Sequence, residues 1–157
     1  MNVFLLDTNI LVGYIRAANY AAYIEKKFQL FNPENISVIS VVSIGEIKSL
    51  AYQFGWREKK ITAMQELIKR IPVINIDLEQ IPNAFAEIDA FSQGKHPTKN
   101  FIDGMRARNM GKNDLWIAAT ANVIKANLLS TDKHFEHLNG TFLNFIYIDQ
   151  NLTERDA

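Results

Sequence analysis

Four carboxylates of the sequence lie where an α/β fold places its chemistry. Asp7 and Asp132 each follow directly after a short apolar run of the kind that forms a buried strand. Glu46 falls in the first turn of a predicted helix after the second strand, and Asp114 falls in the first turn of the helix before the fourth. In open α/β sheets, ligands bind beyond the carboxyl ends of the strands. We therefore expect Asp7, Glu46 and Asp132 to share one edge of the sheet, with Asp114 beside them if its helix starts there.

A cluster of carboxylates favours one kind of chemistry. Like charges at close range destabilise each other unless a cation lies between them. Carboxylate oxygens, in a chain without any cysteine, are the ligands that Mg²⁺ or Mn²⁺ prefers. A divalent ion held in this way activates a water molecule and neutralises the charge that builds on a phosphate. The pattern therefore predicts metal-dependent hydrolysis of a phosphodiester bond, and the lack of cysteine excludes disulfides and a cysteine nucleophile.

Each acid also has a purely structural interpretation. Asp7 is a good N-cap for the helix that follows it. Ser43 and Glu46 match a capping box, S-x-x-E. Asp114 at a helix start is favoured by the helix dipole, and Asp132 could begin a turn or cap a short helix. Any one acid is therefore ambiguous, and only the joint placement of the four favours a site.

The elements that must position these acids alternate along the chain. Strands are predicted at residues 3–6, 36–40, 73–76, 128–130 and 145–148, and helices follow Asp7 and cover residues 20–31, 43–54, 57–71, 79–91 and 113–127, the last with Asn113 as its N-cap. Strands separated by helices imply an α/β/α sandwich, with a central, mostly parallel sheet of about four to five strands. We expect one domain at residues 1–150 and a polar C-terminal tail at residues 151–157.

Charge is balanced overall but concentrated locally. The 17 Lys and Arg residues equal the 17 Asp and Glu residues, which argues against a simple basic coat protein for nucleic acid. A basic, irregular stretch nevertheless leads into Asp114 and could bind RNA phosphates; its members are Lys95, His96, Lys99, Arg106, Arg108 and Lys112. The alternative is a solvated, positively charged loop.

His134 and His137 could share a helix face as a zinc pair, but the usual supporting ligands are not evident.

Four short motifs resemble those of one protein family. They are LLDTNIL at residues 5–11, SIGEI at 43–47, GKNDLWIAATA at 111–121 and LSTDKHF at 129–135. In this order they are similar to the four acidic motifs of PIN-domain proteins, and the third is very similar to that of VapC-type toxins, ribonucleases of type II toxin–antitoxin systems. One departure is the stretch at residues 94–110, which looks longer than the corresponding loop of many family members.

The resemblance implies a function and a set of site residues. It implies a single PIN-like domain that cleaves RNA, with Asp7, Glu46, Asp114 and Asp132 as catalytic residues that bind Mg²⁺ or Mn²⁺. Polar neighbours would support the ion and its waters, and these are Thr8, Asn9, Asn113 and Thr131. It also implies a cognate antitoxin as partner and assembly as a homodimer or a larger toxin–antitoxin complex.

Other functional classes fit the sequence less well. A phosphoaspartyl phosphatase would need a second Asp two positions after the first, where the chain has Asn9, and no P-loop motif is present. The serious alternative is a non-catalytic PIN-like module that binds RNA or a protein.

No apolar run reaches the roughly 20 residues that span a bilayer, and the first residues do not resemble a signal peptide. A cytoplasmic protein without a membrane partner is therefore expected.

Overall fold

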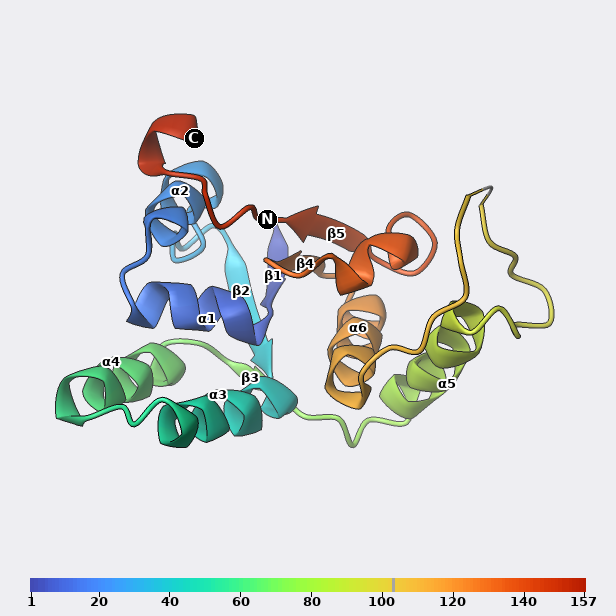
Figure 1. The fold of residues 1–157 in the computed structure, drawn as a ribbon, viewed down its shortest axis with the longest axis horizontal. Coiled ribbons are helices and arrows are strands. Elements are labelled where there is room, and N and C mark those ends of the chain that lie inside the picture. Colours follow the sequence, from blue (N-terminus) through green and yellow to red (C-terminus); the bar gives the residue numbers. More distant parts are fainter. Residues whose placement is uncertain (103) are drawn as a thin grey trace.

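A five-stranded parallel sheet forms the centre of the computed structural model, which describes residues 1–102 and 104–157 (Figure 1). The strands are β1 (Val3–Leu6), β2 (Ile36–Ser40), β3 (Val73–Ile74), β4 (Asn127–Ser130) and β5 (Asn144–Tyr147). Their order is β3-β2-β1-β4-β5, so the chain starts in the middle and builds outward in both directions. The strand order therefore reverses beside β1, and the carboxyl end of β1 is the point where such sheets bind ligands.

Side chains alternate between two separate cores on the two faces of the sheet. Phe4 and Leu6 of β1 pack into one core, while Leu5 between them packs into the other. The first core is covered by α1 (Thr8–Ile15), α2 (Asn19–Phe28), α3 (Val41–Gln53) and α4 (Glu58–Lys69). The second is covered by α5 (Gln80–Ser92), α6 (Lys112–Ile124) and the 3-10 helix η1 (Lys133–Leu138) (Figure 1). Strands buried on both faces explain the continuous apolar runs of the sequence, and the predicted α/β/α fold is confirmed.

Two predicted helix starts are wrong. Helix α3 begins at Val41, because the hydroxyl of Ser40 accepts a hydrogen bond from the Val42 N–H (3.1 Å) and caps the helix there. The capping box expected at Ser43 therefore does not form, and Glu46 lies in the second turn rather than the first. Helix α6 begins at Lys112 after Gly111, so Asn113 is inside the helix and is not its N-cap. Asp114 still lies in the first turn, as predicted.

The segment between α5 and α6 is irregular, as expected, but part of it is anchored. Phe101 packs edge-on against Phe91 of α5, with ring centroids 5.4 Å apart. Met110 is buried, and the Ser92 hydroxyl contacts its sulfur at 3.3 Å. These contacts hold the middle of the segment and its C-terminal end against the second core, while the side chains of Arg106 and Arg108 stay exposed.

The C-terminal residues fold back on the first half of the domain. A short 3-10 helix, η2 (Glu154–Asp156), lies beside α2, where the Lys26 ammonium donates a hydrogen bond to the Glu154 carbonyl (3.2 Å; Figure 1). No helix within residues 1–102 and 104–157 is both long and apolar enough to cross a membrane.

Candidate metal centre

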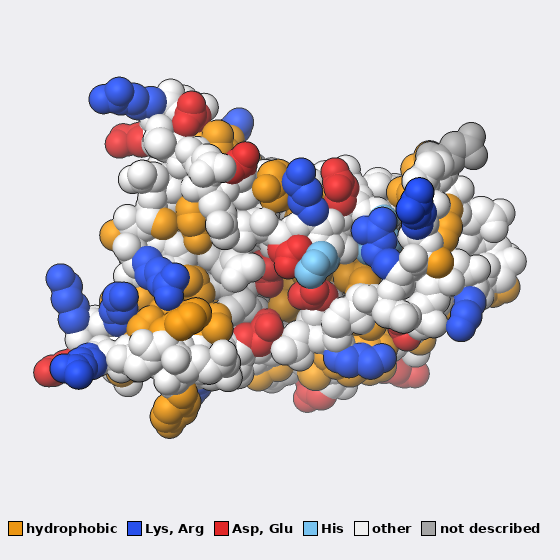
Figure 2. Space-filling model, in the orientation of Figure 1, with side chains coloured by type: hydrophobic (Ala, Val, Ile, Leu, Met, Phe, Trp, Pro, Cys, Tyr) orange, Lys and Arg blue, Asp and Glu red, His pale blue; other side chains and the backbone are white. Residues whose placement is uncertain are grey.

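The four predicted acids line one open cavity of about 750 Å³ at the carboxyl edge of the sheet. Asp7 follows β1, Asp132 follows β4, Glu46 extends from α3 and Asp114 from α6. Acidic side chains gather in the middle of the face shown in Figure 2, with a histidine beside them. The joint placement expected from the strand order is therefore what the fold produces, because the starts of α3 and α6 meet at the same edge.

Asp7 is the most deeply buried of the four. Its carboxylate accepts hydrogen bonds from the Thr8 N–H (2.8 Å) and from the Ser130 hydroxyl (2.6 Å), so it does cap α1. Burial raises the pKa of Asp7 to about 6, the two hydrogen bonds oppose this shift, and the nearby charges of Asp114 and Glu46 add to it. The capping role and a metal-binding role are compatible, but the cap alone does not explain why the group is surrounded by other acids.

A side-chain hydrogen bond connects Glu46 to the first residue of α1. The Thr8 hydroxyl donates a hydrogen bond to Glu46 Oε1 (2.8 Å), which connects α1 to α3 across the cavity. Because α3 starts two residues earlier than expected, Glu46 is about half a turn further along the helix and still lines the cavity.

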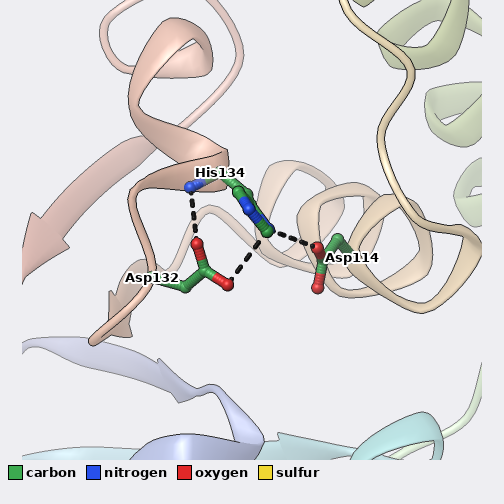
Figure 3. A group of neighbouring side chains, drawn as sticks. All are labelled: Asp114, Asp132 and His134. Carbon is green, nitrogen blue, oxygen red and sulfur yellow. Dashed lines mark hydrogen bonds and ion pairs between the residues drawn. The ribbon is translucent and has the colours of Figure 1, made fainter.

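Asp114, Asp132 and His134 form a compact group on the other side of the cavity (Figure 3). The ring nitrogen Nδ1 of His134 lies 3.3 Å from Asp114 Oδ2 and 3.0 Å from Asp132 Oδ2. Asp132 also caps η1 by accepting the His134 N–H at Oδ1 (2.9 Å). Burial raises the pKa of Asp114, the charges of Asp132 and Glu46 add to this shift, and the contact with His134 opposes it.

Ser130 is a site residue that the sequence did not single out. Its buried hydroxyl donates to Asp7 and also accepts the Asp132 N–H (2.9 Å), so one side chain holds the first and fourth acids in position. A serine at the end of a strand carries no distinguishing signal in a single sequence. Only the pairing of β1 with β4 brings it beside Asp7.

The other predicted residues divide into two groups. Thr8, Asn9 and Asn113 line the cavity, as expected of supporting residues. Thr131 does not line it, and its hydroxyl instead accepts a hydrogen bond from Gln150 Nε2 (3.3 Å).

The predicted alternative of a zinc pair is wrong, because the two histidines face different surroundings. His137 is buried under η1, where its Nε2 contacts the Ser92 hydroxyl (2.8 Å) and its ring stacks on Phe91. His134 points to the acids of the cavity instead (Figure 3).

No member of the predicted basic stretch lines the cavity. Among the described residues that line the cavity, none is Lys or Arg. Lys95 and Arg108 line a separate surface pocket, and Lys99 forms an ion pair with Glu87 (3.7 Å). Lys112 is exposed at the start of α6. In Figure 2, Lys and Arg side chains lie on both sides of the central acids.

The donors of the cavity fit a divalent cation. Four carboxylates line the cavity, and the imidazole of His134 contacts two of them. The pKa values of Asp7 and Asp114 are raised, since the charged forms are disfavoured by burial and by each other. A cation among these groups would remove that repulsion. Oxygen ligands with one imidazole suit Mg²⁺, Mn²⁺ and related ions.

The fold and the cavity together define an α/β protein with a candidate metal centre at the switch point of its sheet. Residues 4–140 match the family model of the PIN domain, and the chain belongs to this family. The resemblance inferred from the four motifs is thereby confirmed. No curated protein matches the chain in sequence.

Several solved structures have the same fold. VapBC2 from Rickettsia felis, bound to a DNA fragment from their promoter, is similar with a TM-score of 0.73 and 20% identity over 94% of this chain and 99% of that one. VapBC-1 from nontypeable Haemophilus influenzae gives a TM-score of 0.65 and 26% identity over 92% and 97% of the two chains. VapBC-5 from Mycobacterium tuberculosis, a member of the VapBC family of toxin-antitoxin systems, gives 0.61 and 17% over 94% and 100%.

Proposed function

We propose that this protein is a Mg²⁺- or Mn²⁺-dependent endoribonuclease that hydrolyses phosphodiester bonds, and that it is the toxin of a toxin–antitoxin pair. The observation that carries the proposal is the convergence of four carboxylates from separate elements on one open cavity. Membership of the PIN domain family supports a nuclease, and the similar VapBC structures support a toxin.

The roles of the acids follow from their positions. Asp7, Asp114 and Asp132 would hold the ion, and Glu46 would complete its site or orient a second ion. When bound, the ion supplies an activated water and neutralises charge on the phosphate. Ser130 and Thr8 hold the carboxylates of Asp7 and Glu46 in place before any ligand arrives, which limits the reorganisation that binding requires.

The basic stretch is the proposed site for the rest of the RNA. The acidic cavity repels a polyanion, so the substrate needs positive charge nearby to bind. Exposed side chains beside the cavity could supply it, and these are Lys95, Lys99, Arg106, Arg108 and Lys112. Contacts of this kind position the backbone without reading its sequence.

The proposed partners are a cognate antitoxin and a second copy of the chain. The three similar structures described above are of VapBC, and one is a member of the VapBC family of toxin-antitoxin systems. A homodimer, or a larger assembly with the antitoxin, is proposed from the resemblance to VapC-type toxins, as is a cytoplasmic location. A small open reading frame next to the gene, encoding the antitoxin, would support this part of the proposal.

Cleavage of RNA by the purified protein tests the function. We expect cleavage with Mg²⁺ or Mn²⁺, arrest by EDTA, and loss in Asp7→Asn. Asp149→Asn is a matched control, because its carboxylate also accepts a backbone N–H, from Asn151 (2.8 Å), but does not line the cavity. Binding of RNA or protein without any cleavage would instead favour the non-catalytic alternative. Cleavage by Asp7→Asn at the parent rate would contradict the assignment of the site.

A further inference from the structure

We propose that His134 is a nitrogen ligand of the metal centre and that it biases the site toward transition-metal ions and away from Mg²⁺. The inference rests on the proposed function, because it assumes that the acids bind an ion. It goes beyond the four carboxylates by naming a fifth donor and by predicting which ions the site prefers.

The position of the imidazole carries the inference. His134 Nδ1 faces two carboxylate oxygens at once, Asp132 Oδ2 at 3.0 Å and Asp114 Oδ2 at 3.3 Å (Figure 3). Neighbouring ligands of an octahedral ion with bonds of about 2.1 Å lie about 3.0 Å apart. The separations of Nδ1 from the two carboxylate oxygens therefore match those of neighbouring ligands, and one ligand atom from each of the three residues lies within 4.8 Å of the others. Without an ion, a proton on Nδ1 would serve these two contacts; with its proton on Nε2 instead, the neutral ring would offer the Nδ1 lone pair to an ion held by the two oxygens.

Two separate elements of the fold hold the three donors in this arrangement. Asp132 accepts the backbone N–H of His134 at Oδ1, so its other oxygen and the imidazole start from the same capped turn. Asp114 is fixed independently by the first turn of α6. Two elements thus bring the three donors together, and the carboxylate that caps η1 also orients the ring above it.

The other two histidines have different partners. His96 contacts Glu87 (3.1 Å), and its Nδ1 accepts backbone N–H groups of the 94–111 segment. His137 is buried against Ser92. His134 is 68% exposed at its side chain, and a contact between such an exposed group and carboxylates contributes little to stability. A role in binding a metal ion explains the position of His134 better than a contribution to folding stability does.

An imidazole ligand changes which ions bind best. Carboxylates alone suit Mg²⁺, which is hard and prefers oxygen, whereas imidazole nitrogen binds later first-row ions more tightly, in the order Mn²⁺, Co²⁺, Ni²⁺. Replacing His134 should therefore weaken Co²⁺ and Mn²⁺ binding by about 10–100-fold and change Mg²⁺ binding by less than about threefold.

Metal binding, rather than activity, tests the inference. Calorimetry with Mg²⁺, Mn²⁺ and Co²⁺ at about pH 8, where a histidine of ordinary pKa is neutral, would compare the parent with His134→Asn and with His96→Asn. The second variant is matched, because it removes an imidazole that lies next to a carboxylate but outside the cavity. Pulsed electron paramagnetic resonance of bound Mn²⁺ should detect coupling to a nitrogen-14 nucleus in the parent and in His96→Asn, and this coupling should vanish in His134→Asn.

The results separate this inference from the proposed function. If the parent binds none of the three ions, both proposals fail. If the parent binds an ion and His134→Asn keeps the nitrogen coupling or the same affinities, only the inference about His134 is overturned. Tighter binding of Mn²⁺ by His134→Asn would also overturn it, because the imidazole would then be competing with the ion for the carboxylates.

Discussion

Replacement of Asp7 by Asn should stabilise the metal-free protein while it destroys the metal centre. The carboxylate is buried, and its pKa is about 6 in the folded protein against an ordinary value of 3.8. Asn is nearly isosteric and can still accept hydrogen bonds from the Thr8 N–H and the Ser130 hydroxyl at its amide oxygen. The variant therefore removes a buried charge without removing the cap of α1.

The pKa shift gives both the sign and the size of the effect. A carboxyl group with a raised pKa binds its proton more tightly in the folded state, so between pH 3.8 and about 6 the folded protein holds more protons than the unfolded chain. Stability therefore falls as the pH rises through this window. The difference is worth about 3 kcal/mol once the pH exceeds 6. Asp7→Asn should recover roughly 1–3 kcal/mol near pH 8 and almost nothing near pH 4.

Urea unfolding in EDTA, at several values between about pH 4 and pH 8, measures this difference directly. Subtracting parent from variant cancels the titration of all other groups that the change leaves alone. The control Asp149→Asn should change stability by less than about 0.5 kcal/mol throughout. A gain for Asp7→Asn that does not vary with pH, or a loss near pH 8, would refute the reasoning about buried charge.

Three further predictions concern the basic stretch, the strand end and α1. Arg106→Ala with Arg108→Ala should weaken RNA binding and reduce the slope of log K against log salt by about 1.4, as expected for two lost phosphate contacts on single strands. Ser130→Ala removes the donor to the buried carboxylate after β1 and should weaken Mn²⁺ binding about 10–100-fold in calorimetry. Gly13→Ala should lower the unfolding free energy by about 1–3 kcal/mol in urea titrations, because a Cβ there would overlap the ring of Tyr20.

Each of these has a matched control. Lys59→Ala with Lys60→Ala removes two exposed charges from α4, away from the cavity, and should leave RNA binding nearly unchanged. Ser37→Ala removes a hydroxyl that donates to a carbonyl (2.8 Å) and should not affect Mn²⁺ binding. Gly45→Ala has free space around its Cβ and should stabilise α3 by about 0.5–1 kcal/mol. Equal effects of a variant and its control would contradict the corresponding prediction.

The sequence was most informative where it contains a short apolar run, because such a run predicts a buried strand and so places the acid that follows it. The run at residues 3–6 forms β1 as predicted, and so does the run at residues 36–40 for β2. Parallel strands share a carboxyl edge, so placing Asp7 and Asp132 after two strands was enough to predict that they meet. The motif around Asp114 added the helix whose first turn closes the cavity.

Local signals failed where two competing residues could cap the same helix. Ser40 and Ser43 are both suitable N-caps, and the sequence match to a capping box favoured the second. In the fold, β2 ends at Ser40 and α3 starts at once, because the Ser40 hydroxyl accepts the Val42 N–H and caps the helix there. Ser130 and His134 could not be assigned to the site for another reason, namely that their roles depend on partners 123 and 20 residues away in the chain.

The chain has no net charge, but the acids gathered in one cavity lower the stability of the folded protein. Burial of the charged Asp7 carboxylate lowers the free energy of unfolding by about 3 kcal/mol at neutral pH. An ion at about one hundred times its dissociation constant stabilises a folded protein by about 2.7 kcal/mol, which is nearly the same amount. Binding would therefore offset this cost to an extent that grows with the concentration of the ion. Since Ser130 links Asp7 to Asp132, an ion held by the Asp132 side should also shift the Asp7 carboxyl toward its charged form. The metal centre and the stability of the sheet edge are then coupled: Asp7→Asn should be more stable than the parent without the ion and should gain no stability when the ion is added.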